Sequence, residues 1–547
     1  MDAPLNISSA RRKTPANDRH DHLVHARDWV ARFTAKNGRP PRILHIGNVG
    51  NYAYANAKMM REIGIDADVI DPDFYHIMAS PEWHETMVSE DHGDDYFPKW
   101  SKTGLWLYDR PDWFMQAPWD FTFRWLNARS RNANREEKRM RFAAGVARRM
   151  VTGDMPEPLG WLLTGQDGFA RFIRRGFRWM ARRATSSGSD LPKERHSAQL
   201  GAVPAEQIVE AVVASDMSTP APVTHTIDPD QITPGSLQYV LDHRELIEPA
   251  LASYDVIHGY ALGAMYPAAL GLKNWVAMEL GTIRGLPFEN SDLGRITRWL
   301  YRRSPEVFIT NFDSVDAADK LDIPASNQHK VTHPYDARIP ARFAADFKSK
   351  RFSTAETPYF LAPARHHWTE GNESILKGND TFLRGAALAA ETADFELVLV
   401  DWGVDADKSR ELIEELGLTD RVRWLKPHSR KALWPIYMSS VGIIDQFAVA
   451  AFGGVALDAM SLGRRLITRM DAQEAKRLPT KTAPPVMAAA TSEAVATQLL
   501  ACLADPEDNA GIGGKLQSWC LDLQDPDRQL LDQLSVYDRI IQASGTN

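Results

Sequence analysis

Residues 42–63 read RILHIGNVGNYAYANAKMMREI. Residues 42–46 are a short, mainly apolar run, residues 47–52 hold two glycines and two asparagines, and residues 53–63 have the apolar spacing of a helix. A second run, DADVID at 66–71, stops at a proline. A strand, a glycine-rich turn, a helix and another strand in this order predict a parallel, doubly wound α/β sheet.

Further short apolar runs form two series, separated by a boundary near residues 336–357. The first series resumes at 254–258, 275–279 and 307–310. The second series comprises 359–362, 396–400, 422–425, 441–444 and 466–468, with helical spacing at 407–416 and 455–462. We therefore predict an α/β fold of two Rossmann-like, doubly wound domains that face each other across a cleft, which is the default place for a ligand.

The composition of residues 83–242 differs from that of both series. It is aromatic and basic at first and rich in serine and proline later, so we interpret it as a helical, partly flexible insertion in the first domain. The predicted organisation is an N-terminal tail and helix at 1–40, an N-terminal domain at 41–340, a C-terminal domain at 341–525 and a C-terminal helix at 526–547.

Composition and charge exclude several classes of protein. A chain of 547 residues is too long for one core. Its 71 acidic and 64 basic residues give no overall attraction for nucleic acid. Cys502 and Cys520 lack the spacing of a disulfide framework or a metal site. Without a signal-peptide pattern or a run of about 18–20 apolar residues, we expect a cytoplasmic protein that binds no metal.

The most informative stretch is DQFAVAAFGGVALDAMSLG at 445–463. It follows a predicted buried strand and passes through Gly453 and Gly454 into a helix that begins near Val455 and carries Asp458. A glycine turn lets a ligand approach the free N–H groups at a helix start, where the helix dipole favours negative charge. A diphosphate group suits this position.

The same stretch resembles the donor-binding motif of glycosyltransferase family 4, in which a Glu-x7-Glu pair brackets a Phe-Gly turn. DAMSLG at 458–463 matches the end of that motif, so the resemblance implies that Asp458 holds the ribose hydroxyls of the donor. The first acid of the pair is replaced by Ala450, and Asp445 with Gln446 upstream offers a partial substitute. The resemblance also implies the GT-B architecture, a nucleotide-sugar substrate with no cofactor, and a retaining, metal-independent transfer.

Two basic residues precede this motif in the second series. Arg365 lies just after a predicted strand, and Lys377 opens the helix that begins KGNDTF. A diphosphate leaving group needs such cations because its negative charge must be stabilised as the glycosidic bond breaks. In the resembling family an Arg and a Lys-Gly do this, so we predict catalytic roles for both residues.

The first series also offers candidate site residues. Gly47, Gly50 and Asn51 resemble the family's glycine loop beneath the donor phosphates and the acceptor. His258 and Glu279 each follow a strand, which predicts catalytic positions at the carboxyl edge of the sheet facing the cleft. A structural alternative stays open for both: His258 as a histidine of the strand end, and Glu279 as a cap of the next turn.

Residues 113–183 contain five tryptophans, and within them 169–183 alternates apolar residues with six arginines at helical spacing. A basic amphipathic helix with aromatic residues predicts peripheral contact with an anionic membrane, here the inner face. An ordinary helix packed on the first domain with a solvated arginine face is an equal alternative. Stacking of nucleic-acid bases is the weakest reading because the chain is acidic overall.

These features predict a glycosyltransferase that moves a sugar from a nucleotide-diphosphate sugar to a glycan, lipid or small-molecule acceptor, in polysaccharide or glycoconjugate biosynthesis. The acceptor would enter past Gly50, His258 and Glu279. Two alternatives stay open: a nucleotide-sugar-binding or scaffold protein of this fold that has lost turnover, which Ala450 favours, and a sugar-nucleotide epimerase of the same architecture.

Overall fold

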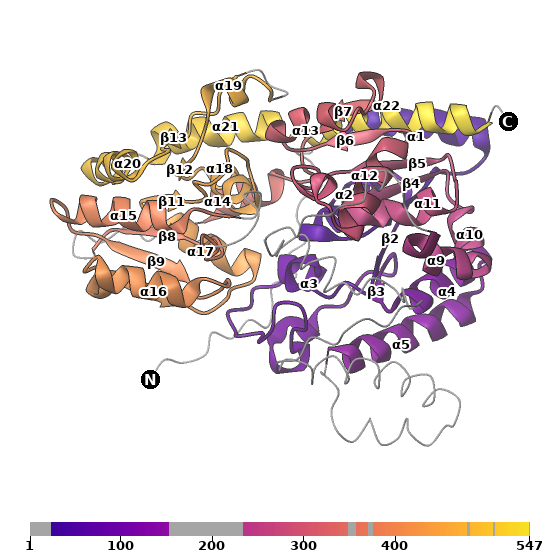
Figure 1. Cartoon of the computed structure of the whole chain (residues 1–547), viewed down its shortest axis with the longest axis horizontal. Helices are drawn as coiled ribbons and strands as arrows, with labels where there is room; N and C mark the ends of the chain where they lie inside the picture. Colours follow the sequence, from indigo (N-terminus) through magenta and orange to yellow (C-terminus); the bar gives the residue numbers. More distant parts are fainter. Residues whose placement is uncertain are drawn as a thin grey trace, which may run out of the picture.

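The computed structural model describes residues 23–152, 234–347, 357–369, 376–478, 482–506 and 509–545. Its described strands form two separate sheets, each surrounded by helices (Figure 1). We call the seven-stranded sheet with its helices the first lobe and the six-stranded sheet with its helices the second lobe. The named strand pairs of both sheets are parallel.

The sheet of the first lobe has the order β3-β2-β1-β4-β5-β6-β7. Its strands are β1 (Arg42–Ile46), β2 (Asp66–Pro72), β3 (Phe114–Ala117), β4 (Val256–Tyr260), β5 (Trp275–Met278), β6 (Val307–Ile309) and β7 (Gln328–Lys330). Its helices are α1 (Val24–Asn37), α2 (Tyr52–Glu62), α3 (Pro81–Glu85), α4 (Trp119–Ser130), α5 (Asn134–Val151), α9 (Pro234–Asp242), α10 (Arg244–Leu251), α11 (Met265–Ala269), α12 (Asp292–Arg303) and α13 (Val315–Lys320). Successive side chains of β1 enter opposite cores: Leu44 and Ile46 lie in one apolar cluster and Ile43 in the other. This burial on both faces explains the continuous apolar run.

The sheet of the second lobe has the order β10-β9-β8-β11-β12-β13. Its strands are β8 (Tyr359–Ala362), β9 (Glu396–Val400), β10 (Val422–Leu425), β11 (Gly442–Ile444), β12 (Leu466–Thr468) and β13 (Met487–Ala488). Its helices are α14 (Arg338–Asp346), α15 (Asn379–Ala390), α16 (Ala406–Glu415), α17 (Arg430–Ser439), α18 (Gly454–Ser461), α19 (Ala472–Ala475), α20 (Ser492–Ala504) and α21 (Gly514–Leu523). Apolar clusters cover both of its faces. The predicted α/β fold of two Rossmann-like domains, the GT-B architecture, is confirmed.

The last helix, α22 (Pro526–Gly545), returns to the first lobe and lies beside α1 (Figure 1). Leu534 and Tyr537 of α22 are fully buried in the cluster that contains Ile43 of β1. The chain thus crosses between the lobes twice, before α14 and before α22. Gln529 joins the two crossings, because its side chain accepts a hydrogen bond from the N–H of Tyr335 (3.2 Å) and donates one to the Tyr335 carbonyl (3.0 Å).

The region predicted as an insertion, 83–242, requires a correction. Its residues 114–117 form β3, which pairs with β2, and Trp125 of α4 is fully buried in the first lobe's core. A strand of only four residues in an aromatic, basic context carries too little pattern to be recognised. Residues 153–233, including the basic amphipathic stretch 169–183, lie outside the described residues, so the predicted membrane contact stays a prediction. No helix within the described segments combines the length and apolar composition needed to cross a bilayer.

Candidate functional site

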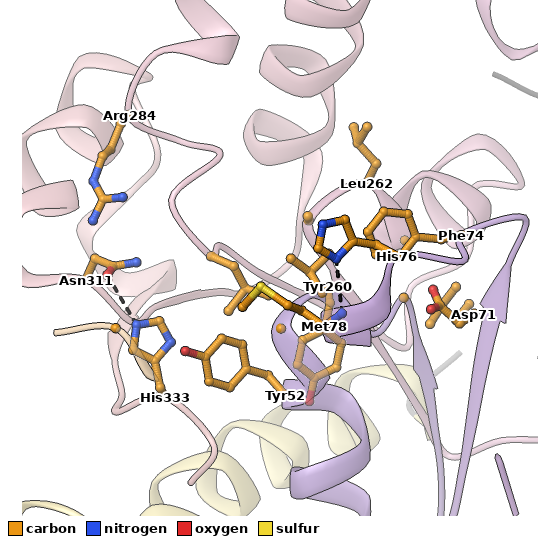
Figure 2. Close-up of a pocket in the computed structure, with 18 of the residues that line it drawn as sticks. Tyr52, Asp71, Phe74, His76, Met78, Tyr260, Leu262, Arg284, Asn311 and His333 are labelled. Carbon is orange, nitrogen blue, oxygen red and sulfur yellow. Dashed lines mark hydrogen bonds between the residues drawn. The ribbon is translucent and has the colours of Figure 1, made fainter. Parts of the chain in front are cut away.

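Two adjoining chambers lie between the lobes, at the carboxyl ends of the strands. The apolar chamber encloses about 310 Å³, mainly against the first lobe. The charged chamber encloses about 240 Å³ and lies between α2, α3, α17 and α18. The residues that line both chambers, and so form the wall between them, are Gly50, Tyr52, Met78, Arg365, Lys377 and Gly453. Figure 2 shows the apolar chamber, with Tyr52 lying between His333 and Met78.

The glycine turn after β1 lies against both chambers. Gly47 has φ +88°, and a Cβ there would lie 3.0 Å from the Tyr260 carbonyl oxygen. Gly50 and Asn51 are also left-handed, at φ 61° and 64°. Gly47 lines the apolar chamber, Asn51 the charged chamber and Gly50 both. Asn48 fixes the turn by donating to Asn51 Oδ1 at 3.0 Å. The turn therefore brings the chain close to the space between the lobes, where a larger side chain would intrude.

Lys377 and Arg365 form the cationic part of the shared wall. The Lys377 ammonium donates to Gln446 Oε1 at 2.7 Å. Burial lowers the pKa of Lys377 to about 8, and Arg365 adds to this effect while Asp445 opposes it. Arg365 makes no hydrogen bond or ion pair within the described part of the chain and lines both chambers. The structure thus brings together the two cations predicted from the second series.

Asp445 lines the charged chamber and Gln446 the apolar chamber, and both side chains are buried. Gln446 is fixed in place, because it accepts from Lys377 and donates to the Ala451 carbonyl at 2.5 Å. Asp445 Oδ2 has no hydrogen-bond partner in the described residues. Burial raises the pKa of Asp445 to about 6, against the opposing effect of Lys377.

Asp458 lines the charged chamber but is not a free carboxylate. Arg430 donates to both of its oxygens, with Nε 2.8 Å from Oδ2, and the Tyr335 hydroxyl donates to Oδ1 at 2.8 Å. The Arg430 guanidinium also lies over the Tyr335 ring, 4.7 Å from its centroid. A carboxylate accepts about four hydrogen bonds, so these contacts leave room for one more, chiefly on Oδ2.

The start of α18 opens onto the same chamber. Gly453, Gly454 and Val455 line the charged chamber, and neither glycine has an atom within 4 Å of where a Cβ would stand. The space beside these residues is therefore open to a ligand at the helix start. Ala450 lies elsewhere, 4% exposed in the core of the second lobe and lining neither chamber.

The structure corrects the predicted site roles of His258 and Glu279, which line neither chamber. His258 is fully buried beneath α22, with Nδ1 2.7 Å from the Tyr537 hydroxyl, and burial keeps its pKa well below the ordinary value. His258 is the central residue of β4 and does not follow the strand as predicted, and its side chain points to the face that α22 covers.

Glu279 is also fully buried and acts as a cap for two turns. Its Oε1 accepts hydrogen bonds from the N–H groups of Thr310 and Asn311, both at 2.9 Å, and its Oε2 accepts one from the N–H of Gly281. With both oxygens bonded to backbone, the carboxylate cannot serve a substrate. The structural alternative holds for this residue as it does for the histidine.

Several residues that line the chambers were missed by the sequence analysis. The Tyr52 ring stacks on His333 with the centroids 4.7 Å apart. Arg284 forms a bidentate pair with Asp313. Asp73 lines the apolar chamber and Arg430 the charged one. Only Tyr52 carried a signal, because it directly follows the glycine turn.

A contact between the lobes closes one side of the charged chamber. Glu85 of α3 binds Lys431 of the second lobe at 2.7 Å and Lys58 of α2 at 2.5 Å. Burial opposes ionisation, but the two lysines together lower the pKa of Glu85 to about 2. The Ser429 hydroxyl accepts from the Val88 N–H at 2.8 Å. The segment after β2 therefore touches both lobes.

Comparisons with known proteins give distant structural likenesses only. No protein family matches the sequence, and no curated protein does. HepE of Anabaena, solved with UDP, is 17% identical with a TM-score of 0.41, over 56% of this chain and 85% of HepE. Sucrose-phosphate synthase of Thermosynechococcus elongatus is 16% identical with a TM-score of 0.42, over 62% of this chain and 92% of that protein.

A third solved structure is similar over nearly the whole chain. A glycosyltransferase from Rickettsia africae ESF-5 is 11% identical with a TM-score of 0.45, and the match covers 92% of this chain and 98% of that protein. Because these likenesses are distant, we base the functional assignment on the residues of the two chambers.

Proposed function

We propose that this protein transfers a sugar from a nucleotide-diphosphate sugar to the hydroxyl group of an acceptor. The observation that carries the proposal is the shared wall. Among the described residues, Arg365 has no hydrogen-bond or ion-pair partner there, and the Lys377 ammonium is bonded only to a neutral amide. Two cations held together without a carboxylate bound to either are costly unless an anion binds between them. The open helix start at Gly453 and Gly454 adds N–H groups at the same place.

The two chambers divide the donor and the acceptor between them. The nucleotide occupies the charged chamber, its diphosphate lies at the shared wall, and the sugar faces the apolar chamber. Negative charge on the diphosphate increases as the bond from the anomeric carbon breaks, and Arg365 and Lys377 stabilise that charge. This stabilisation grows toward the transition state, which is what accelerates the step.

The resemblance to family 4 supplies the stereochemistry of the proposal, which is retaining and metal-independent. The bond from the anomeric carbon to the diphosphate oxygen breaks, and a bond to the acceptor oxygen forms on the same face of the sugar. The departing diphosphate oxygen accepts the acceptor's proton, so no side chain is required as a dedicated base. Lys377 and Arg365 hold that oxygen in place.

Asp458 and Arg430 act as one unit in this proposal. Arg430 and Tyr335 fix the Asp458 carboxylate, and its remaining lone pair accepts a hydrogen bond from a ribose hydroxyl of the donor. Asp445 and Gln446 act from behind the wall by positioning Lys377.

The test is hydrolysis across a panel of nucleotide sugars that includes UDP-glucose, detected by mass spectrometry with the full chain. We expect release of a nucleoside diphosphate from at least one donor. Lys377→Met should abolish the release, and the matched change Lys273→Met, at an exposed lysine, should leave it unchanged. A wild-type protein that neither hydrolyses nor binds any nucleotide sugar contradicts the proposal.

A binding protein without turnover is the second candidate, and Ala450 favours it. The resemblance places a carboxylate at that position, whereas the alanine is buried in the core of the second lobe. Tight nucleotide-sugar binding with no release of the diphosphate, in the presence or absence of acceptors, would assign this second function.

A further inference from the structure

The walls of the apolar chamber include many aromatic and aliphatic side chains. Aromatic and aliphatic side chains from the connection after β2, from α9, from the segment around α11 and from α12 surround it. The main ones are Phe74, Tyr239, Leu262, Tyr266, Leu293 and Ile296. A volume of about 310 Å³ is at the lower end for small-molecule sites. These walls match a compact, apolar body.

The charges of the first lobe at this chamber are acidic. Asp71 and Asp73 line it, and the one arginine that the first lobe contributes, Arg284, is already bound by both oxygens of Asp313 at 2.6 and 2.8 Å. Burial raises the pKa of both carboxyls, and the first lobe offers an anionic guest no free cation. The two cations of the shared wall are engaged by the diphosphate in the proposed function. The chamber thus disfavours a negatively charged guest.

Asp73 is the carboxylate available to a guest. Asp71 accepts from the Asn48 N–H and from Gln116, whereas the one donor to Asp73 within the described segments is the Trp119 N–H, at 3.3 Å. Asp73 has φ +57°, a left-handed conformation that Asp and Asn adopt more readily than most residues. Burial raises the pKa of Asp73 to about 7, because water solvates this carboxyl poorly.

Other polar atoms of the chamber lack partners as well. His333 is 8% exposed, and its Nδ1 has no hydrogen-bond partner among the residues that the structure describes, while its Nε2 lies 3.2 Å from Asn311 Oδ1. The Tyr239 hydroxyl is also buried without a partner in that part of the chain. Buried polar atoms in native proteins are normally paired, so these atoms indicate places where the polar groups of a ligand bind.

We propose that the apolar chamber is the acceptor subsite and takes an uncharged alcohol with an apolar or aromatic body, anchored by a hydrogen bond from its hydroxyl to Asp73. This inference rests on the proposed function. A bare sugar has no apolar body to bury against Phe74, Tyr266 and the other apolar walls, so it would gain little from them. An anionic acceptor would lose water without meeting a free cation of the first lobe.

The test is calorimetric binding of four probes to the full chain saturated with UDP, so that the diphosphate engages the two cations of the shared wall: glucose, hexyl β-D-glucoside, phenyl β-D-glucoside and phenyl β-D-glucuronide. We expect the uncharged glycosides to bind at least about tenfold more tightly than glucose, because their apolar groups leave water. The glucuronide differs from the phenyl glucoside by a carboxylate and should bind about tenfold more weakly. If the phenyl glucoside binds more tightly, the acceptor is aromatic. If the hexyl glucoside binds more tightly, the acceptor is lipid-like.

Asp73→Asn tests the anchor, because asparagine tolerates the left-handed backbone while losing the charge. We expect about tenfold weaker binding of the glucosides and a smaller penalty for the glucuronide. Asp322→Asn is the matched control: Asp322 also has positive φ (+56°) but is exposed and pairs with Arg302. Asp322→Asn should leave the affinity for all four probes unchanged.

Equal affinity for glucose and the two glycosides, or glucuronide binding as tight as that of the glucoside, overturns the inference, and both comparisons use the wild-type chain. If Asp73→Asn binds the glucosides as tightly as the wild type, the anchoring role of Asp73 is wrong. If the glycosides bind as expected but no nucleotide sugar is hydrolysed, the proposed function and the acceptor role fail while the selectivity of the chamber stands. If a donor is hydrolysed but the selectivity is missing, only this inference fails.

Discussion

Lys377→Met is expected to weaken nucleotide binding while making the protein more stable. The pKa of Lys377 is lowered from 10.5 to about 8, and at about 1.4 kcal/mol per unit this corresponds to about 3 kcal/mol against the charged form. The side chain is partly exposed, which reduces the cost to about 1–3 kcal/mol. Loss of the 2.7 Å bond to Gln446 subtracts about 1 kcal/mol. The net gain in unfolding free energy is therefore about 1 kcal/mol at neutral pH.

The loss of binding should be larger than this gain. A hydrogen bond from an ammonium to a phosphate contributes about 1.5–3 kcal/mol, which is roughly 10–100-fold in affinity. Calorimetry with the nucleoside diphosphate that binds the wild type most tightly measures the affinity, and urea unfolding measures the stability. Lys273→Met should alter neither quantity. A Lys377→Met protein that binds the diphosphate as tightly as the wild type would refute the assignment of this cation.

Three further predictions concern the same cleft. Diphosphate affinity should fall as pH rises through about 8, since Lys377 is charged below its lowered pKa and neutral above it. The Lys377→Arg variant stays charged, so calorimetric titrations on either side of that pH should give it the same affinity. Asp458→Asn leaves the Arg430 guanidinium without its counter-charge and should lower the urea unfolding free energy by about 3 kcal/mol; an unchanged midpoint would contradict the pairing. Gly47 has φ +88°, and the Cβ of Gly47→Ala would lie 3.0 Å from a backbone carbonyl oxygen, so we expect the urea unfolding free energy to fall by about 1–3 kcal/mol. The fall should be smaller for Gly271→Ala, where φ is +70° and the space is open.

The sequence predicted the two sheets because strands buried on both faces are continuous apolar runs. The runs at 42–46 and 396–400 are clear examples, and both are strands. Three strands carried no such signal. β7 has the polar sequence QHK at a sheet edge, β13 has two residues, and β3 lies in an aromatic, basic region. Edge position and shortness remove the pattern on which the prediction depends.

The candidate site was predictable where position along the strand decides it. Arg365 and Lys377 lie in the connection between β8 and α15, and both line the wall between the chambers. His258 lies in the middle of β4 and Glu279 directly follows β5, and both side chains are buried away from the chambers. The sequence pattern indicates neither the exact end of a strand nor the face to which a side chain points. The walls of the apolar chamber, such as Tyr239 and Ile296, come from distant segments, and only tertiary packing places them together.

The two crossings bonded by Gln529 and Tyr335 restrict how the lobes move. A single connection allows one body to swivel about the other, whereas two neighbouring connections resist torsion and leave bending about one axis through both. The Glu85–Lys431 contact between α3 and α17 lies away from the crossings, which are beside α21 and α22 (Figure 1). A rotation about that axis would separate the Glu85–Lys431 ion pair, which closes one side of the charged chamber.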